Sequence, residues 1–336
     1  MNIAIIYHDA DFDGKLSNEV CRYHLTGLHP DANVHSYGWD YDRPLPLLIP
    51  LVRVLPHKPQ VLWCDYDKIY IVDLSVDALM ERPELRDKII WIDHHKSAIE
   101  RWSARGLKGY RIDGVAACRL CWQWFSFDFG PNSDLRHHPV DWYLPQIRDY
   151  IDRKVDEPTL LRLAGEYDVW DHRDPDAKAL QFGLRALSDV ELAGLIHYQF
   201  ACGPRDVVDR LYLQPAIEQG HAIKAYCDKQ NDEYSASCSH TIRFEGLNFC
   251  ALNIGQRGNS DLMRGGITPD HQALFAWRHV GLGNNPIYVS LYHAPGHEDL
   301  DLSEIAKRWG GGGHRGACGF RTTLAQLDDI LIGVQA

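Results

Sequence analysis

The chain has 336 residues, enough for about two domains, and 45% of them are hydrophobic, so a sizeable core can form. Acidic residues outnumber lysine plus arginine by 46 to 35, and this formal charge of −11 argues against a broad basic surface for long duplex DNA. No stretch approaches the roughly 20 apolar residues of a membrane span, and the odd number of scattered cysteines, nine, favours a reducing, cytoplasmic setting.

Apolar runs typical of strands alternate with helical spacing in the first part of the chain. Strands are predicted at residues 2–7, 34–39, 69–72 and 88–92, with a shorter one at 110–112. Helical spacing follows the first strand at 16–25 and returns at about 114–125, whereas the proline-rich stretch 40–60 predicts a surface excursion. This alternation indicates βαβ crossovers, and therefore an α/β domain with a parallel sheet flanked by helices.

The remainder of the chain changes character twice. Residues 139–232 look mostly helical, with one long helix expected at 207–231. Strands then return at 241–244, 247–252, 273–277 and 287–292, with helices beginning at 261–264 and spanning 302–309. We therefore expect a smaller C-terminal α/β domain with a mixed sheet. The expected domains are 1–205, a helical linker at 206–234, and 235–336.

Acidic and histidine side chains follow three of the predicted strands at the point where each strand ends. They are His8, Asp9, Asp11 and Asp13 after the first strand, Asp73 after the strand at 69–72, and Asp93, His94 and His95 after the strand at 88–92. The carboxyl ends of parallel strands meet at one edge of a sheet, so these groups should converge. Clustered carboxylates repel one another, and the group would take up a proton or bind cations.

Imidazoles together with several carboxylates suit two ions of the Mn²⁺ type. Asp73 could bridge such ions, and a metal-bound water would lose a proton and attack a phosphorus atom held in line. The structural alternative is that Asp73 and Asp93 merely cap the helices that follow, and that the glycine run 310–313 is a flexible loop. Because all of these features occur together at element ends, the pattern favours a phosphoester hydrolase.

The same motifs, in this order, resemble the DHH phosphoesterase superfamily with its DHH-associated C-terminal domain. The matching pieces are HDADFDG at 8–14, VDLS at 72–75, DHH at 93–95, GVAACRLCW at 114–122, EYDVW at 166–170 and GGGGHRGACGF at 310–320. The resemblance spans nearly the whole chain. Members of this superfamily include RecJ-like single-strand exonucleases, oligoribonucleases (nano-RNases), cyclic-dinucleotide phosphodiesterases and pyrophosphatases with a different second domain.

The resemblance implies a role for each matching residue. The implied metal ligands are His8, Asp11, Asp13, Asp73, His94 and Asp168. Asp73 is implied to bridge two Mn²⁺ ions, with Mg²⁺ as the alternative metal, and His95 to lie behind the ligands or face the substrate. Asp73 and His95 are thus the candidate catalytic residues. The implied substrate-binding residues are Gly311, Gly312, Gly313, His314 and Arg315.

Some positions leave alternatives open. Asp9 is an additional acid beside His8, and the sequence does not tell which of the two points at the metal. Asp168 is favoured as the last ligand for its place before Val-Trp, although Glu166 and Asp171 compete with it. Lys15 either contacts phosphate or reaches solvent.

The first interpretation is a two-metal-dependent phosphodiesterase that shortens small single-stranded RNA or DNA from an end, in the manner of an exonuclease or nano-RNase. The alternative is a phosphodiesterase for a cyclic or linear dinucleotide or a small phospho-nucleotide. A non-enzymatic alternative is a nucleotide-binding protein with a decayed site, but no matched carboxylate is missing. No membrane partner is expected. The sequence leaves the sugar, the direction of attack and the oligomeric state open, and a dimer is compatible with it.

Overall fold

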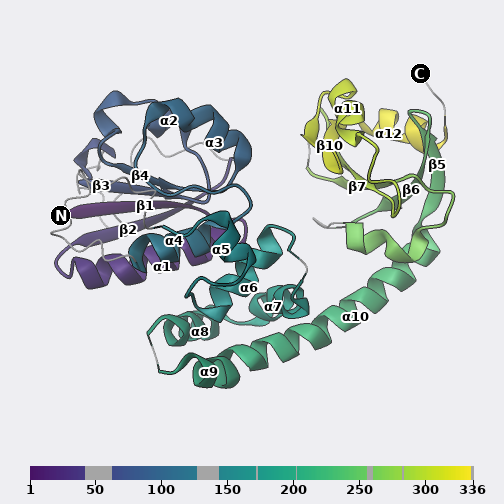
Figure 1. Cartoon of the computed structure of the whole chain (residues 1–336). Coiled ribbons are helices and arrows are strands. Elements are labelled where there is room, and N and C mark those ends of the chain that lie inside the picture. The colour runs from purple at the N-terminus through teal and green to yellow at the C-terminus, as the bar shows by residue number, and fades with distance from the viewer. Residues whose placement is uncertain are drawn as a thin grey trace, which may run out of the picture. The chain divides into compact units, whose positions relative to one another are not determined.

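The computed structural model describes residues 1–41, 63–126, 144–171, 173–201, 203–255, 260–281 and 284–333, and the proline-rich stretch predicted as a surface excursion lies almost wholly outside them. The chain divides into two compact units, Met1–His221 and Ala222–Ala336. Each unit has a sheet of its own, labelled in Figure 1. Within the described residues, no helix is long and apolar enough to cross a membrane.

The sheet of the first unit is parallel. In spatial order its strands are β2 (Asn33–Trp39), β1 (Asn2–His8), β3 (Lys68–Val72) and β4 (Ile89–Ile92). Tyr7 pairs with Val72, and Val72 pairs with Ile92, so β1, β3 and β4 end side by side. The residues that follow these three strands therefore emerge together at one edge, as the predicted parallel sheet requires.

Helices cover both faces of this sheet. In β1, Ile3 and Ile5 join the core shared with α1 (Phe12–Leu28) and α4 (Ala117–Ser126). Ala4 and Ile6 join the core on the other face, where α2 (Asp77–Met80) and α3 (Lys96–Trp102) pack. In Figure 1, α2 and α3 accordingly lie across the strands from α1 and α4. Burial on both faces explains the unbroken apolar sequence of β1, since each buried Ile stabilises the fold by roughly 1.5–3 kcal/mol.

Short helices complete the first unit. They are α5 (Ile147–Ile151), α6 (Thr159–Asp168), α7 (Pro175–Ala186), α8 (Asp189–Ala201) and α9 (Arg205–Val208). The long helix expected at 207–231 is present, but it is not a regular α-helix throughout, because α9 passes into a π-helical turn, Asp209–Leu213, before α10 (Gln214–Cys238) begins. Pro215 has no N–H to donate to the carbonyl four residues earlier, so a regular α-helix cannot run through it.

The second unit contains the mixed sheet that the sequence predicted. In spatial order its strands are β5 (His240–Phe244), β6 (Leu247–Asn253), β7 (Ala273–His279), β8 (Ile287–His293), β10 (Ala317–Thr322) and β9 (Gly312–His314). The β6–β7 pair is parallel, and the other pairs are antiparallel. Two helices, α11 (Leu302–Arg308) and α12 (Leu324–Leu331), accompany it.

Three local predictions need correction. The helix expected to begin at 261–264 is a 3₁₀ helix, Ser260–Gly266. The short strand expected at 110–112 is an isolated bridge between Arg111 and Asp93. The glycine run 310–313, for which the structural alternative was a flexible loop, leads into the β9–β10 hairpin, because backbone pairing satisfies its amides more fully than a loop would.

Candidate metal centre

One half of the site forms where β1 runs into α1. His8 ends β1, and Asp11 is the N-cap of α1, where its side chain accepts a hydrogen bond from the Gly14 amide. The Nδ1 atom of His8 lies 3.0 Å from Asp11 Oδ2 and 3.5 Å from Asp73 Oδ2. Position 14 must be glycine, since a Cβ there would lie 1.9 Å from the carbonyl oxygen of His8. The tight turn thus places Asp11 against His8.

Asp73 stands between the two halves of the site. It follows β3 with a φ of 61°, the left-handed region that costs an L residue roughly 1–2 kcal/mol. Asp73 Oδ2 faces His8, while Oδ1 lies 3.3 Å from His94 Nε2. Within the described residues, the buried Oδ1 makes no hydrogen bond. A shared carboxylate with an unsatisfied buried oxygen fits a bridging cation ligand, and strained backbone at such a residue is common in functional sites.

The other half of the site gathers around His94. Its Nε2 atom lies 3.3 Å from Asp168 Oδ2 and 3.6 Å from Asp13 Oδ2. Asp13 is buried in the first turn of α1 and accepts hydrogen bonds of 2.8 and 2.7 Å from the amides of Ala117 and Cys118 at the start of α4. Asp168 is the last residue of α6. Three segments far apart in the sequence therefore supply this group.

The charges of the cluster are strongly coupled. Hydrogen bonds that the imidazole of His8 donates to Asp11 and Asp73 raise its pKa to about 11. Burial disfavours the charged form of His94, yet Asp73, Asp13 and Asp168 raise its pKa to about 10. Burial and neighbouring carboxylates raise the pKa of both Asp13 and Asp168 to about 7. The metal-free cluster thus retains protons that a divalent cation would displace, and its donor set fits such a cation.

Asp93 organises the histidine pair. It is fully buried, and its Oδ1 accepts hydrogen bonds from the amides of His94 at 2.7 Å and His95 at 3.2 Å. The same oxygen lies 2.7 Å from His95 Nδ1, and this hydrogen bond raises the pKa of the imidazole. The His95 side chain is 46% exposed, so it faces outward beside His94. Asp93 does not cap α3, whose N-cap is His95, so the structural alternative is wrong for this residue. Asp93 instead holds the turn before the helix and orients His95.

The structure shows where the acids lie that the sequence left as alternative metal ligands. Glu166 binds the guanidinium groups of two arginines, and Asp171 pairs with Arg173. Asp9 lies against the backbone of β2, where a Cβ on Gly38 would be 2.9 Å from its carboxylate. Lys15 is exposed, with its Nζ 5.6 Å from the centre of the Phe12 ring. The six acids and histidines suggested as ligands come together, whereas these acids lie outside the groups that could hold a metal.

One residue of this site escaped the sequence analysis. Asp40 Oδ1 lies 3.6 Å from His8 Nε2. Asp40 directly follows β2, which is the parallel neighbour of β1. It therefore carries the same signal as the other acids, an acidic residue at the end of a strand, but β2 is less apolar and the sheet order is not apparent from the sequence.

The suggested substrate-binding residues lie in the second unit. Gly312–His314 form β9, an edge strand, and His314 is exposed. A Cβ on Gly311 would lie 2.1 Å from the Gly319 carbonyl oxygen, and one on Gly313 would lie 2.6 Å from Cys318 Cα. Arg315 donates hydrogen bonds to the carbonyl oxygens of Leu300 and Asp299. Part of this motif thus serves the packing of the hairpin.

Comparisons with known proteins agree with this architecture. No family model and no curated protein matches the chain. Among solved structures, the pGpG-specific phosphodiesterase PggH from Vibrio cholerae is similar over 98% of this chain and 96% of its own, with a TM-score of 0.50 and 14% identity. The DHH domain of a member of a ribosomal-protein family is similar over 98% of this chain and 85% of its own, with a TM-score of 0.51 and 12% identity. This chain has the DHH fold. The resemblance read from the motifs is therefore confirmed at the level of the fold, and in this DHH fold the strand-end cluster could hold metal ions.

Proposed function

We propose that this protein is a two-metal-dependent phosphodiesterase. The observation that carries the proposal is the position of Asp73, whose two carboxylate oxygens face different histidines. The donors fall into three overlapping groups: His8, Asp11 and Asp73; Asp73, His94 and His95; and Asp13, His94 and Asp168. Asp73 joins the His8 side of the site to the His94 side, and a carboxylate shared in this way suits a pair of divalent ions that clamp a phosphodiester. Mn²⁺ fits the mixed nitrogen and oxygen donors, and Mg²⁺ is the alternative.

Bound metal ions would supply a hydroxide nucleophile at neutral pH and neutralise charge on the phosphate. The chain's own residues fix the geometry. Asp13 is held by two α4 amides, and its position does not depend on the ions. His95 is oriented by Asp93, and its raised pKa favours the protonated ring. We assign His95 the role of donating a proton to the leaving oxygen, because it is exposed beside the cluster.

Short single-stranded oligonucleotides cleaved from an end are the proposed substrates. The net charge of −11 disfavours long nucleic acid, which binds through many phosphate contacts. The glycine strand, which we define as Gly311–Arg315, is proposed to bind the terminal phosphate or nucleotide through His314 and exposed backbone. The similar Vibrio cholerae protein acts on pGpG, the shortest linear oligonucleotide, and this supports including dinucleotides among the substrates. Hydrolysis of cyclic dinucleotides is the alternative.

A panel of end-labelled substrates tests the proposal. It contains RNA and DNA of two to five nucleotides, pGpG, a cyclic dinucleotide and a long single strand, each incubated with Mn²⁺, Mg²⁺ or a chelator. Release of mononucleotides from the short linear substrates, dependent on Mn²⁺, is expected. Binding of nucleotides without turnover under every metal condition would instead support the non-enzymatic alternative. Cleavage of long strands as efficient as that of dinucleotides would contradict the proposed length preference.

A further inference from the structure

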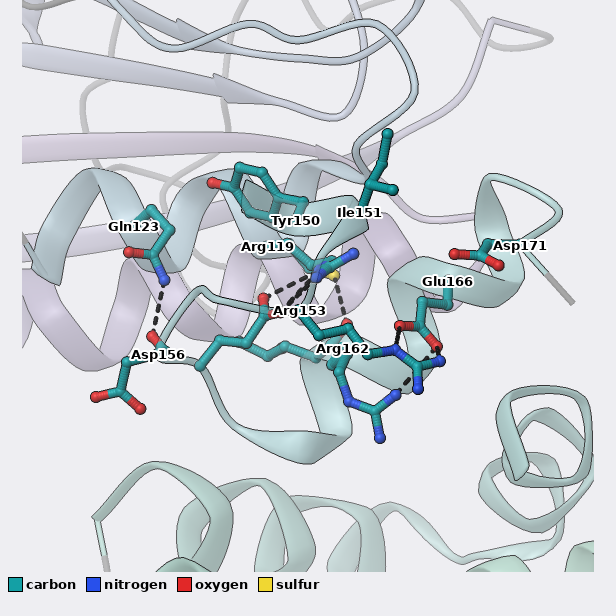
Figure 2. A network of polar contacts seen from close by, with 12 residues as sticks. Arg119, Gln123, Tyr150, Ile151, Arg153, Asp156, Arg162, Glu166 and Asp171 are labelled. Carbon is teal, nitrogen blue, oxygen red and sulfur yellow. Dashed lines mark hydrogen bonds and ion pairs between the residues drawn. The ribbon is translucent and has the colours of Figure 1, made fainter. Parts of the chain in front are cut away.

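A buried carboxylate lies two residues before Asp168. Glu166 is fully buried, and its Oε1 and Oε2 accept hydrogen bonds of 2.8 and 2.9 Å from Nε and Nη2 of Arg153. Arg162, one helical turn earlier on α6, donates to the same carboxylate at 3.1 Å and to Asp174 at 2.9 Å. Figure 2 shows the guanidinium groups of both arginines converging on Glu166, with Asp171 pointing elsewhere. We call Arg153, Arg162, Glu166 and Asp174 the arginine clamp.

The arginine clamp fixes the end of the helix that carries Asp168. After Asp168, the amide of Asp171 donates back to the carbonyl oxygen of Glu166 at 2.8 Å, and the amide of Trp170 donates to Tyr167 at 3.2 Å. Trp170 adopts a φ of 59°, so the helix closes with a left-handed residue, as in a Schellman motif. Glycine is the usual residue there. The turn that positions Asp168 is therefore unfavourable for its own sequence and needs support from outside.

That support comes from a separate segment of the chain. Arg153 follows α5 and itself adopts a left-handed φ of 53°. Its bidentate contact joins the loop after α5 to the last turn of α6. On the neighbouring helix α4, Arg119 forms a buried ion pair with Glu157 and packs so close to α6 that a Cβ on Gly165 would lie 2.6 Å from its Cδ. Helix α6 is thus held on two sides next to Asp168.

Stability alone is a weak reason for such a cluster, since desolvation of buried ion pairs largely offsets their attraction. Their directional hydrogen bonds instead select one backbone arrangement. The Asp168 carboxylate lies 3.3 Å from His94 Nε2 only if the last turn of α6 is held in this form. We propose that Arg153 and Glu166 are positioning residues that hold Asp168 ready to bind a metal ion. This inference rests on the proposed metal centre, and neither residue touches the ion.

Direct Mn²⁺ binding to the full-length protein, measured by titration calorimetry and by electron paramagnetic resonance of free Mn²⁺, tests the inference. Glu166→Gln and Arg153→Gln should each lower the affinity for one of the two Mn²⁺ ions by about 10- to 100-fold. This is the usual effect of disturbing the residues that hold a metal ligand in place. The double variant should be no weaker than either single one, because the two residues act as a unit. Lys154→Gln is the matched control, since it removes an exposed adjacent cation that contacts Asp152, and its Mn²⁺ binding should stay at the wild-type level.

Kinetics with a generic diester and with an oligonucleotide give a second measurement. The Mn²⁺ concentration for half-maximal rate should rise in Glu166→Gln, while kcat at saturating Mn²⁺ and KM for the oligonucleotide stay near wild type. If Glu166→Gln fails to fold, as judged by melting in a chelator, Arg162→Gln replaces it as the test variant. It removes one of the three hydrogen bonds that Arg153 and Arg162 donate to Glu166, and it should lower Mn²⁺ affinity by a smaller factor.

Two results would overturn the inference and leave the proposed function standing. One is wild-type Mn²⁺ affinity in folded Glu166→Gln. The other is a raised oligonucleotide KM in Arg153→Gln with unchanged Mn²⁺ binding, which would make Arg153 a substrate contact. A wild-type protein that binds no divalent ion would remove both the inference and the proposed function.

Discussion

The strand-end cluster of the first unit is built from side chains, whereas the glycine strand of the second unit is built mainly from backbone. His94 lies within 3.6 Å of three carboxylates and is mostly buried. His314 stands exposed on an edge strand. In the first region, burial and neighbouring charges set the pKa values of the histidines and carboxylates before any ligand binds. In the second, close packing of glycines fixes the shape of a hairpin and leaves one imidazole in solvent. The two regions should therefore respond differently to substitution.

Asp73→Asn should have the largest effect on activity. Asparagine tolerates the left-handed backbone of this position better than alanine does, so the fold should survive. The substitution replaces the carboxylate that faces both histidines with a neutral amide. We expect kcat for bis-p-nitrophenyl phosphate with Mn²⁺ to fall by more than about a thousandfold, equivalent to roughly 4 kcal/mol. Melting in a chelator serves as the control: the variant should still unfold cooperatively, with a modest loss of stability because Asp73 attracts the protonated imidazoles of His8 and His94 in the metal-free site. Activity within tenfold of wild type would show that the side chains of this cluster do not carry the chemistry.

Gly311→Ala and Gly312→Ala separate packing from binding in the glycine strand. A Cβ on Gly311 would clash with the backbone of β10, whereas one on Gly312 meets nothing within 4 Å. Gly311→Ala should lower the free energy of unfolding by about 1–3 kcal/mol, in the range of overpacking a well-packed region. Gly312→Ala should leave it unchanged within about 0.5 kcal/mol. Urea denaturation followed by tryptophan fluorescence measures both. Equal destabilisation by the two substitutions would refute the packing role assigned to Gly311.

His314→Ala tests the proposed binding role of the second unit. A hydrogen bond to a charged phosphate contributes about 1.5–3 kcal/mol, so kcat/KM for a short oligonucleotide should fall by about tenfold to a hundredfold. Hydrolysis of bis-p-nitrophenyl phosphate, which has no terminal nucleotide, should change much less, and bound Mn²⁺ should stay at the wild-type level. Loss of Mn²⁺, or equal losses on both substrates, would place His314 in the reaction centre and erase the contrast between the two regions.

His24 is a histidine whose pKa shift is caused by burial, with no carboxylate of the described residues contributing to it. The His24 ring stacks on Phe125 with ring centres 5.1 Å apart, and burial lowers the pKa of His24 to about 4. By contrast, the carboxylates around His94 raise the pKa of His94 to about 10. The unfolded chain takes up this proton near the ordinary histidine pKa of about 6.5. The contribution of neutral His24 to stability is thus complete above pH 6.5 and is lost as the pH falls to 4, by about 3 kcal/mol.

His24→Leu should remove this part of the pH dependence. The difference in unfolding free energy between variant and wild type, measured by urea denaturation at pH 7, 5.5 and 4 in a chelator, should shift in favour of the variant as the pH falls. A difference that is the same at all three pH values would mean that His24 titrates alike in the folded and unfolded chain.

The sequence predicted the parts of this molecule that depend on local patterns. Burial of the apolar run before His8 makes a strand, and the acids behind it must then lie at the strand's end. Asp40 was missed because its membership depends on β2 lying beside β1, which is a property of the sheet order. The sequence favoured Asp168 over Glu166 only for its place before Val-Trp, because the contact that occupies Glu166 comes from Arg153, thirteen residues away. The β9–β10 hairpin was not predicted, because its glycines carry no strand propensity.

Helix α10 has a consequence for hydrogen exchange. At one end, a Cβ on Gly220 would lie 1.9 Å from the Ala179 carbonyl oxygen, and at the other, a Cβ on Gly265 would lie 2.2 Å from the carbonyl oxygen of Asp232 on the helix. Each end of α10 is therefore pressed against the backbone of a different unit. None of the residues 221–231 between them is buried. Opening of the amides at each end requires loosening of the adjacent unit, whereas the middle opens by itself. One continuous helix should thus exchange slowly at both ends and fast at its centre, the reverse of an isolated helix, whose ends fray first.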